Sequence, residues 1–520
     1  MDRSDLVRGH TSRVSGGTPR RVTAALVGLV CVAALLRFYR IGHQSLWIDE
    51  ILTLQAAEVG GRLTAAAFFR NVQGPLHALL VHLAARISHS ESVLRGISAV
   101  AGVATVPVVY LLGRELADRR SGLIAAALFA VSPFGVWYGQ EVRNYSLLVF
   151  FAALSTLFMA RLVLGRGRPW AAYVAAIVLA AYCNMAGLIL AVAHALCAAG
   201  KAAGDKRFAR QWAVASLVVV VLVAPTLWGL AAWTGTDDVA GRVALAPATD
   251  DAALLRGETT FTPLAVPYSL FALWYGYSLG PSLEELHTRP PLAAFLDDWW
   301  LVAPAGLAAA FAALLGLRVL AGDRDRMGLV LAVLLVTFGG ATVLALLNVK
   351  PMNARYVSPA LPVLLALCGT GVALLRKGPA VVVAAVMAGF SLLSLSNYYV
   401  RPEYSREDVR GAARYVEENE RPGDAVLVPV IKDVFEFYYR GGADRIVVYP
   451  GQADSDAEVA SRIGQGAAGH RRLWFVEARL WRTDPDGRIP AHLGSSYRLI
   501  EDREFAGTRL FLYDLGAGPG

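Results

Sequence analysis

Two adjacent acids follow the first long apolar run of the chain. Asp49 and Glu50 come after an apolar stretch over 22–40 and close behind Trp47. Tryptophan prefers the interface between membrane and water, so Trp47 would set the depth of the acid pair. A carboxylate at the centre of a bilayer costs about 2.5–3.5 kcal/mol on insertion scales, so acids beside a membrane are usually solvated or functional. Taken alone, the pair fits an ordinary loop after a helix end, but the rest of the chain favours a site.

Other polar residues lie at the ends of apolar runs on the same predicted side of the membrane. They are Glu141, Arg143, Lys350, Arg355 and the stretch 280–287. Arg and Lys bind phosphate through charge-assisted hydrogen bonds, and a carboxylate suits a general base that deprotonates a hydroxyl or an amine. A single Arg or Lys would be interpreted as an interfacial anchor. Because these residues share one side, we expect a pocket for an anionic lipid head group beside a reacting centre.

The elements that must position these residues are membrane spans. The 520 residues are 56% hydrophobic, and the mean hydropathy is +0.47. Apolar runs of about 20 residues recur, which is the length that crosses a bilayer core roughly 30 Å thick. The net charge is +8, but the basic residues gather in short loops between apolar runs, which argues against a nucleic-acid partner. No disulfide framework or zinc site is expected, because the cysteines lie in apolar segments without metal-like spacing: Cys31, Cys183, Cys197 and Cys368.

The loop charges alternate between two sides and predict a polytopic α-helical protein with about eleven spans, N-terminus inside and C-terminus outside. A basic tail, 1–21, precedes a membrane domain over 22–399 whose first span is not cleaved. The expected spans are 22–40, 93–113, 121–139, 145–164, a hairpin of two over 170–199, 211–233, 299–318, 327–348, 357–375 and 379–398.

Three shorter apolar stretches are expected not to cross the membrane. In the first outer loop, 50–90, we predict interfacial helices over 50–70 and 74–86, with a tilted span as the alternative for the second. The aromatic stretch 263–280 is predicted to be interfacial or re-entrant, because a true span there would reverse the alternation of loop charges.

Residues 400–520 have a different character from the rest of the chain. They are charged, with an amphipathic pattern over 408–419 and short apolar runs at 425–431, 446–449, 473–476 and 510–513. Helices alternating with short strands predict a small soluble α/β domain. This domain contains no phosphate loop, nucleophile elbow or metal-binding spacing, so we predict a docking or lid role for it.

The stretch from Arg37 to Glu50, with Arg-Phe-Tyr-Arg-Ile-Gly before Ser-Leu-Trp-Ile-Asp-Glu, resembles a known family. It is similar to the start of bacterial transferases related to protein O-mannosyltransferases and the lipid A aminoarabinose transferase, in the multi-span C class of glycosyltransferases. Further similar stretches follow in the family's order at 74–83, 94–107, 132–145, 280–287 and 349–356. There are two departures. Gln-Gly-Pro-Leu at 73–76 replaces a frequent His-Pro-Pro-Leu, and Cys-Asn-Met at 183–185 replaces a frequent Thr-His-Tyr.

The resemblance implies transfer of a sugar from a polyprenyl-phosphate donor to an extracytoplasmic lipid, glycan or protein, with inversion, at the plasma (inner) membrane. It implies Asp49 as the catalytic base with Glu50 as its companion, and Arg143, Lys350 and Arg355 as ligands of the donor phosphate. The remaining candidates for the substrate pocket are Glu141, Tyr145, His77 and Tyr356. No residue is assigned to a metal and no cofactor is expected, although the resemblance leaves a divalent metal open.

Two alternatives belong to other functional classes. A transporter or flippase of a lipid-linked sugar predicts ionisable residues in the middle of spans and internal repeats. Neither is found in the sequence, where the charges lie at span ends. A scaffold that only presents the C-terminal domain would tolerate replacement of Asp49 by Asn.

Overall fold

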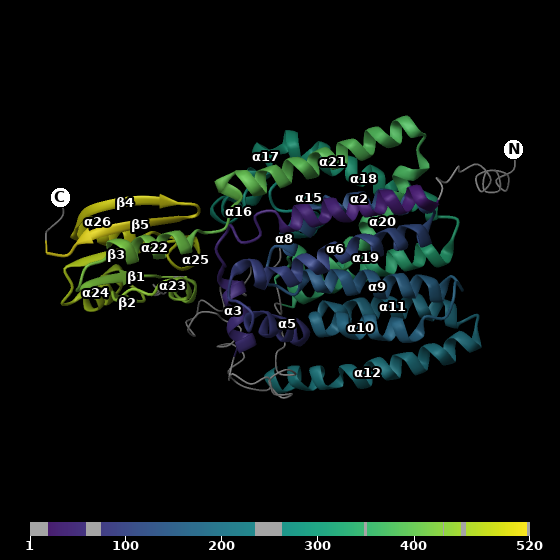
Figure 1. Ribbon diagram of the computed structural model, residues 1–520, viewed down its shortest axis with the longest axis horizontal. Helices are drawn as coiled ribbons and strands as arrows, with labels where there is room; N and C mark the ends of the chain where they lie inside the picture. The colour runs from purple at the N-terminus through teal and green to yellow at the C-terminus, as the bar shows by residue number, and fades with distance from the viewer. Residues whose placement is uncertain are drawn as a thin grey trace.

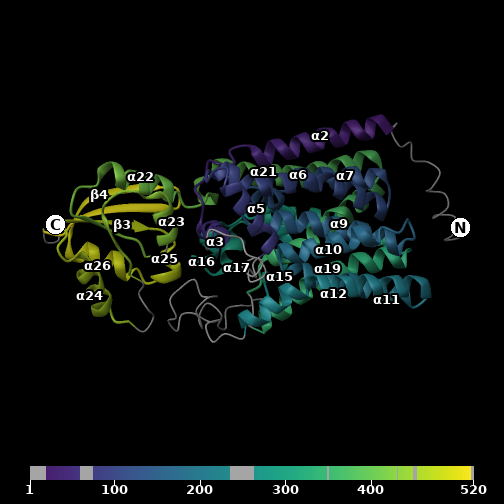
Figure 2. The same cartoon turned by 60° about the horizontal axis from the view of Figure 1, so that its bottom comes forward.

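The computed structural model describes residues 19–58, 74–234, 263–347, 351–429, 431–448 and 454–516. The molecule is elongated, with a bundle of long helices and an α/β domain at one end (Figures 1 and 2). The first described helix begins at the opposite end of the bundle from that domain (Figure 1). The predicted class, a polytopic helical membrane protein with a small C-terminal α/β domain, is confirmed.

Eight helical segments of the described ranges are long and apolar enough to cross a membrane. They comprise α2 (Pro19–Phe38), α6 (Glu91–Leu116), α9 (Tyr145–Val163), α12 (Lys206–Thr234), α18 (Trp299–Leu320), α19 (Arg324–Leu346), the 3-10 turn η1 (Ala354–Ala360) with α20 (Leu361–Leu374), and α21 (Lys377–Val400). A bent pair, α7 (Arg119–Ala130) and α8 (Pro133–Gly139), adds a ninth. Two shorter helices, α10 (Trp170–Cys183) and α11 (Ala186–Ala202), form the predicted hairpin. If the two shorter helices are counted as spans, the described residues contain eleven spans, as predicted.

The span predicted over 121–139 is broken. Its two helices, α7 and α8, meet at 53°. The hydroxyl of Ser132 accepts a hydrogen bond from the Gly135 N–H at 3.1 Å and caps α8, while Pro133 takes the first helical position. Arg37 donates to carbonyl groups at the end of α7 at 3.0 and 3.2 Å. A side chain from α2 therefore replaces hydrogen bonds that the break removes.

Glycines bring α18 and α20 into backbone contact. A Cβ atom on Gly316 would lie 2.2 Å from the carbonyl oxygen of Leu367, and one on Gly371 would lie 1.9 Å from that of Ala312. Small residues allow such close packing in membranes, where the lipid provides no hydrophobic drive for helix association. Most of α20 is buried, so this contact lies at the centre of the bundle.

Short helices cover the end of the bundle nearest the C-terminal domain. They are α3 (Ile48–Glu58), α5 (Pro75–Ala85), α15 (Ala265–Tyr275), α16 (Leu283–Thr288) and α17 (Pro291–Asp297). With 11 residues, α15 is too short to span a bilayer, in agreement with the prediction for 263–280. The part of the predicted 50–70 helix beyond Glu58 lies outside the described residues, as does most of the basic tail.

The C-terminal domain is a mixed five-stranded sheet with helices on its faces. Its strands are β1 (Asp424–Leu427), β2 (Asp444–Ile446), β3 (Arg472–Glu477), β4 (Arg498–Phe505) and β5 (Thr508–Asp514), in the order β2-β1-β3-β5-β4. Strand β1 runs parallel to β2 and β3, and β5 runs antiparallel to β3 and β4. The helices are η2 (Pro402–Tyr404), α22 (Val409–Asn419), α23 (Lys432–Tyr438), α24 (Asp456–Ala467), α25 (Leu480–Thr483) and α26 (Arg488–Ser496).

One hydrophobic core joins this domain to the first loop of the membrane part. Buried side chains of α3 and α5, such as Ile51 and Val81, belong to the same cluster as Val409, Phe435 and Trp474 of the C-terminal domain. Burial of apolar area stabilises such contacts by roughly 25 cal/mol per Å². The domain is therefore packed onto α3 and α5 and does not hang freely from α21.

The contact between α18 and α20 predicts that Gly371→Ala lowers the stability of the protein. Adding a methyl group to a filled helix contact costs about 1–3 kcal/mol. The thermal midpoint of the detergent-solubilised protein measures this loss. The matched control is Gly389→Ala in α21, where a Cβ atom meets nothing within 4 Å. Equal midpoints for the two variants would contradict the prediction.

Candidate active site

The first turn of α3 carries both predicted acids. Asp49 and Glu50 lie where backbone N–H groups lack helical partners and the helix dipole favours negative charge. Glu50 Oε2 accepts the backbone N–H of Trp47 at 3.2 Å. Successive side chains of a helix point about 100° apart, since each turn holds about 3.6 residues. The two carboxylates therefore meet different surroundings.

Asp49 faces two arginines from distant parts of the chain. Its Oδ2 lies 3.1 Å from Arg355 Nη1, on η1, and 3.7 Å from Arg143 Nη2, in the loop between α8 and α9. Arg143 Nη1 also donates to the backbone carbonyl of Asp49 at 3.1 Å and to Thr53 Oγ1 at 2.9 Å. The side chains of Asp49, Arg143 and Arg355 are 17%, 11% and 25% exposed. We name these three residues the front cluster, which a ligand can reach.

Tyrosine rings flank the two arginines. The guanidinium of Arg143 lies 5.7 Å from the ring centre of Tyr145, and that of Arg355 lies 5.1 Å from that of Tyr356. Arg355 Nη2 also lies 3.2 Å from the Tyr356 hydroxyl and donates to it. Such cation–π contacts restrain the planes of the guanidinium groups. The arginines are thus held in place before any ligand binds.

Glu50 is fully buried and its carboxylate is occupied. Arg95 donates from Nε to Oε1 at 2.9 Å and from Nη2 to Oε2 at 2.8 Å, as a two-bond pair. The Val142 N–H donates to Oε1 at 2.8 Å, and Arg406 Nη1 donates to Oε2 at 3.2 Å. Burial alone would raise the pKa of Glu50, but the two arginine charges and these hydrogen bonds hold it below its usual value. Because both oxygens of Glu50 already accept hydrogen bonds, Glu50 fits a structural role better than the predicted catalytic role.

Glu141 is a second buried carboxyl group next to Glu50. Its Oε1 accepts from Trp137 Nε1 at 2.9 Å and from Arg406 Nη2 at 2.8 Å. Its Oε2 has no hydrogen-bond partner among the described residues. Burial raises the pKa of Glu141 to about 7 against the lowering effect of Arg406. We name Glu50, Arg95, Glu141 and Arg406 the rear cluster.

Arg95 fixes the segment that leads into α3. Besides its two bonds to Glu50, it donates to the carbonyl oxygens of Ile41, Gln44 and Ser45 at 2.9, 2.8 and 2.9 Å. All five guanidinium N–H groups are thereby used. Neither Arg95 nor Arg406 is among the site residues predicted from the sequence, and the only signal for Arg95 is a charge at the start of an apolar run.

The structure brings most of the predicted site residues to one place. Asp49, Arg143, Tyr145, Arg355 and Tyr356 surround one spot, and Glu50 and Glu141 lie behind it. His77 is buried on α5, where burial and the charge of Arg143 lower its pKa to about 3, so its ring is neutral. Lys350 lies outside the described residues. Across the described ranges, no three His, Cys, Asp or Glu side chains gather as a metal site would require.

The two departures from the family pattern touch each other. Gly74 adopts φ 126°, a conformation that favours glycine. A Cβ atom there would lie 2.1 Å from the carbonyl oxygen of Cys183 and 2.8 Å from Asn144 Nδ2. Gly74 and Cys183 are therefore neighbours, and a larger residue at position 74 would collide with the 183–185 stretch unless that stretch moved.

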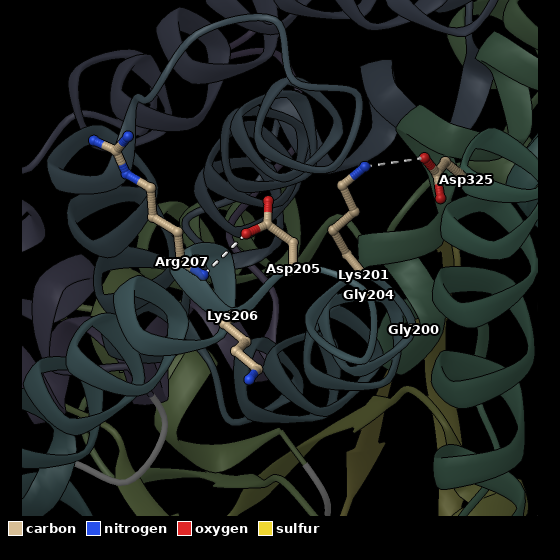
Figure 3. A pocket seen from close by; sticks show the side chains of 7 residues that line it. All are labelled: Gly200, Lys201, Gly204, Asp205, Lys206, Arg207 and Asp325. Carbon is tan, nitrogen blue, oxygen red and sulfur yellow. Dashed lines mark hydrogen bonds and ion pairs between the residues drawn. The ribbon is translucent and has the colours of Figure 1, made fainter.

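A pocket lies far from both clusters, at the turn between α11 and α12 (Figure 3). Lys201 and Asp325 approach to 3.7 Å across it. Its lining residues are Gly200, Lys201, Gly204, Asp205, Lys206, Arg207 and Asp325. This turn and α3 lie at opposite ends of the bundle (Figure 2), so the pocket takes no part in chemistry at Asp49.

Comparison with known proteins gives a family and a fold. Residues 72–228 match the family model for dolichyl-phosphate-mannose-protein mannosyltransferase. That segment includes Arg95, Glu141 and Arg143. No curated protein matches the chain.

Solved membrane enzymes share the architecture. ArnT from Cupriavidus metallidurans in the apo state is 14% identical, with 96% of this chain and 100% of that one covered and a TM-score of 0.55. ArnT bound to undecaprenyl phosphate is 13% identical, with coverage of 94% and 98% and a TM-score of 0.52. The oligosaccharyltransferase AglB from Archaeoglobus fulgidus, with an inhibitory peptide and a dolichol-phosphate, is 13% identical, with coverage of 94% and 74% and a TM-score of 0.52.

The family match over 72–228 and the shared fold agree with the resemblance to the multi-span C class of glycosyltransferases. The resemblance drawn from the sequence is thereby confirmed. In this chain, α3 lies at the end of the bundle next to the C-terminal domain (Figure 2). The front cluster, which includes Asp49 of α3, is the candidate active site.

The rear cluster predicts a loss of stability when one member of its central pair is removed. Glu50→Gln or Arg95→Met should each destabilise the protein by about 3–5 kcal/mol, because an unpaired buried charge remains. The double variant should lose less than the two single losses combined. Thermal unfolding in detergent measures all three. Glu58→Gln, which breaks an exposed contact with His89, is the control and should change stability by at most about 1 kcal/mol. Additive losses in the double variant would count against the pairing.

Proposed function

We propose that this glycosyltransferase takes a sugar from a polyprenyl-phosphate donor and transfers it, with inversion, to an extracytoplasmic lipid, glycan or protein. The observation that carries the proposal is Asp49, a partly exposed carboxylate in contact with Arg143 and Arg355. The undecaprenyl phosphate bound to ArnT and the dolichol-phosphate bound to AglB support this class of donor.

The charge of the front cluster suits this donor. Two guanidinium groups face one carboxylate, which leaves one positive charge. A sugar linked to a polyprenyl phosphate is a phosphodiester with one negative charge, so the donor balances the site. As the bond to the sugar breaks, the phosphate gains further negative charge. Arg143 and Arg355 would then stabilise the transition state more than the bound donor, which is the requirement for catalysis.

The reaction follows as one displacement. The Asp49 carboxylate accepts the proton of the acceptor hydroxyl or amine, and the acceptor atom forms a bond to the anomeric carbon. The bond between that carbon and the phosphate oxygen breaks, and the electron pair leaves with the polyprenyl phosphate. Attack opposite the leaving group inverts the anomeric carbon. We assign Glu50 to positioning, because both of its oxygens already accept hydrogen bonds.

The orientation and division of the chain are parts of the same proposal. From the basic loops we infer that the tail 1–21 lies inside and the front cluster outside the plasma (inner) membrane. A membrane domain over 22–399 then carries the chemistry, and a soluble domain over 400–520 lies on the same side as the front cluster. Lys350 remains a predicted ligand of the donor phosphate.

The proposal predicts that Asp49→Asn reduces transfer by at least about a hundredfold while the protein still folds, since general base catalysis contributes 10²–10⁴-fold. Purified protein in liposomes receives a panel of radiolabelled polyprenyl-phosphate sugars and membranes that contain the acceptor. Glu58→Gln, at the far end of α3, is the matched control and should transfer normally. Label that crosses the membrane while still on its lipid would favour the transporter alternative.

Arg355→Ala should raise the donor KM by about ten- to a hundredfold, because a charge-assisted hydrogen bond contributes roughly 1.5–3 kcal/mol. The same liposome assay with varied donor concentration gives this value. The control is Arg289→Ala, which removes a partly exposed arginine paired with Asp297. A donor KM equal to that of the wild type would exclude the phosphate-binding role of Arg355.

A further inference from the structure

The rear cluster receives one of its cations from outside the membrane part. Arg406 lies between η2 and α22, after the last span, and is 6% exposed. Its guanidinium reaches Glu50 at 3.2 Å and Glu141 at 2.8 Å, and lies 5.4 Å from the ring centre of Trp137. Its backbone N–H donates to Gln44 at 3.3 Å. The segment that leads into the C-terminal domain thus enters the bundle next to the candidate active site.

Arg406 has a task that Arg95 cannot perform. Buried carboxylates are costly unless a cation or hydrogen-bond donors compensate them. Arg95 uses all five of its N–H groups on Glu50 and the loop before α3. Among the described residues, Arg406 is the only cation that forms an ion pair with Glu141. Without Arg406, Glu50 would keep its pair with Arg95, and Glu141 would have no ion-pair partner among the described residues.

The front cluster depends on the same contacts. Asp49 precedes Glu50 on α3, and the Val142 N–H bound to Glu50 lies between Glu141 and Arg143 in sequence. The rear cluster therefore fixes two of the three supports of the front cluster, the start of α3 and the loop 140–144, whereas Arg355 is carried by η1. A shift of either support changes the separation of Asp49 and Arg143.

We propose that Arg406 is a positioning residue, and that docking of the C-terminal domain completes the active site by placing this guanidinium between Glu50 and Glu141. The effect on sugar transfer rests on the proposed function, whereas the effect on the geometry of the loop does not.

The docked position of the domain has other supports, which provide a matched control. Arg410 Nη1 lies 2.7 Å from Glu91 Oε1, and the Tyr438 hydroxyl donates to the same oxygen at 2.9 Å. The Leu46 N–H donates to the Tyr438 hydroxyl at 2.7 Å. Arg410 belongs to the same interface as Arg406 but contacts neither Glu50 nor Glu141. Arg410 also donates to the carbonyl oxygens of Gly42 and His43 in the loop before α3. Replacing it therefore weakens docking and these loop contacts while leaving the ion pairs of Glu50 and Glu141 in place.

The experiment compares Arg406→Met with Arg410→Met in the liposome transfer assay. We expect Arg406→Met to lower kcat by at least about tenfold with the donor KM changed less than about twofold, and Arg410→Met to remain within about threefold of the wild type for both. Equal losses in the two variants would mean that Arg406 only helps docking, and would overturn the proposal.

The pH dependence separates positioning from docking. Arg406 lowers the pKa of Glu141, so its removal favours neutral Glu141, and the defect of Arg406→Met should be smaller near pH 6 than near pH 8.5. The double variant Arg406→Met with Glu141→Gln should recover activity, because no unpaired charge remains. If Arg406→Met alone folds poorly, this double variant still tests the pairing of Arg406 with Glu141. A defect independent of pH and of Glu141 would overturn the proposal. The charged and titratable groups around Glu141 are Asp49, Glu50, Arg143, Arg406, Tyr138, Tyr277 and Tyr398.

A measurement without substrate distinguishes failure of this inference from failure of the proposed function. Hydrogen exchange of the purified protein should quicken over 140–145 in Arg406→Met and stay at the wild-type rate there in Arg410→Met. If the wild-type protein transfers no sugar, the proposed function fails. The exchange result still decides whether Arg406 positions the loop 140–145. Unchanged exchange over 140–145 in Arg406→Met would overturn the inference.

Discussion

The buried carboxylate of Glu50 is the constraint on which this end of the molecule depends. It accepts hydrogen bonds from Trp47 just before α3, from α6, from the loop before α9 and from the segment after the last span. Replacing a buried ion pair by apolar residues is often neutral or stabilising, so such a pair is weak grounds for stability as such. Its effect here is geometric, because four separate segments can satisfy this carboxylate in only one arrangement.

Asp49 and Glu50 are adjacent in the first turn of α3, but their carboxylates have different surroundings and suit different roles. Glu50 points into the protein, where every oxygen is occupied, and Asp49 points to a partly open surface with two arginines. The contrast comes from helical geometry, which turns adjacent side chains about 100° apart. A buried, paired carboxylate suits positioning, and an accessible one suits proton transfer.

Much of the fold could be predicted from the sequence, because a span is a local property of about 20 consecutive residues. The helix over 408–419 likewise follows from local periodicity and appears as α22 with Asp408 as its cap. The break between α7 and α8 was missed, because Arg37 compensates it from another helix. Strand β4 was missed because it is an edge strand with mostly exposed, charged residues.

The site was partly predictable, because the ends of the spans could be located from local sequence. Residues at span ends on one side, such as Asp49, Arg143 and Arg355, could be grouped from loop alternation alone. The partners of Glu50 could not, because Arg95 lies 45 residues away and Arg406 lies 356 residues away. A pattern in a single sequence does not encode contacts over such separations, although a charge in an apolar run, as at Arg95, signals a buried partner.

The order of synthesis gives the position of Arg406 a further meaning. Ribosomes produce Glu50 and Glu141 early, whereas Arg406 emerges only after α21, the last span, is complete. During that interval Arg95 can pair with Glu50, but it has no N–H group left for Glu141. A chain that stops before residue 406 retains an unpaired carboxyl group behind Asp49. Assembly of this site is thus tied to the arrival of the final quarter of the chain.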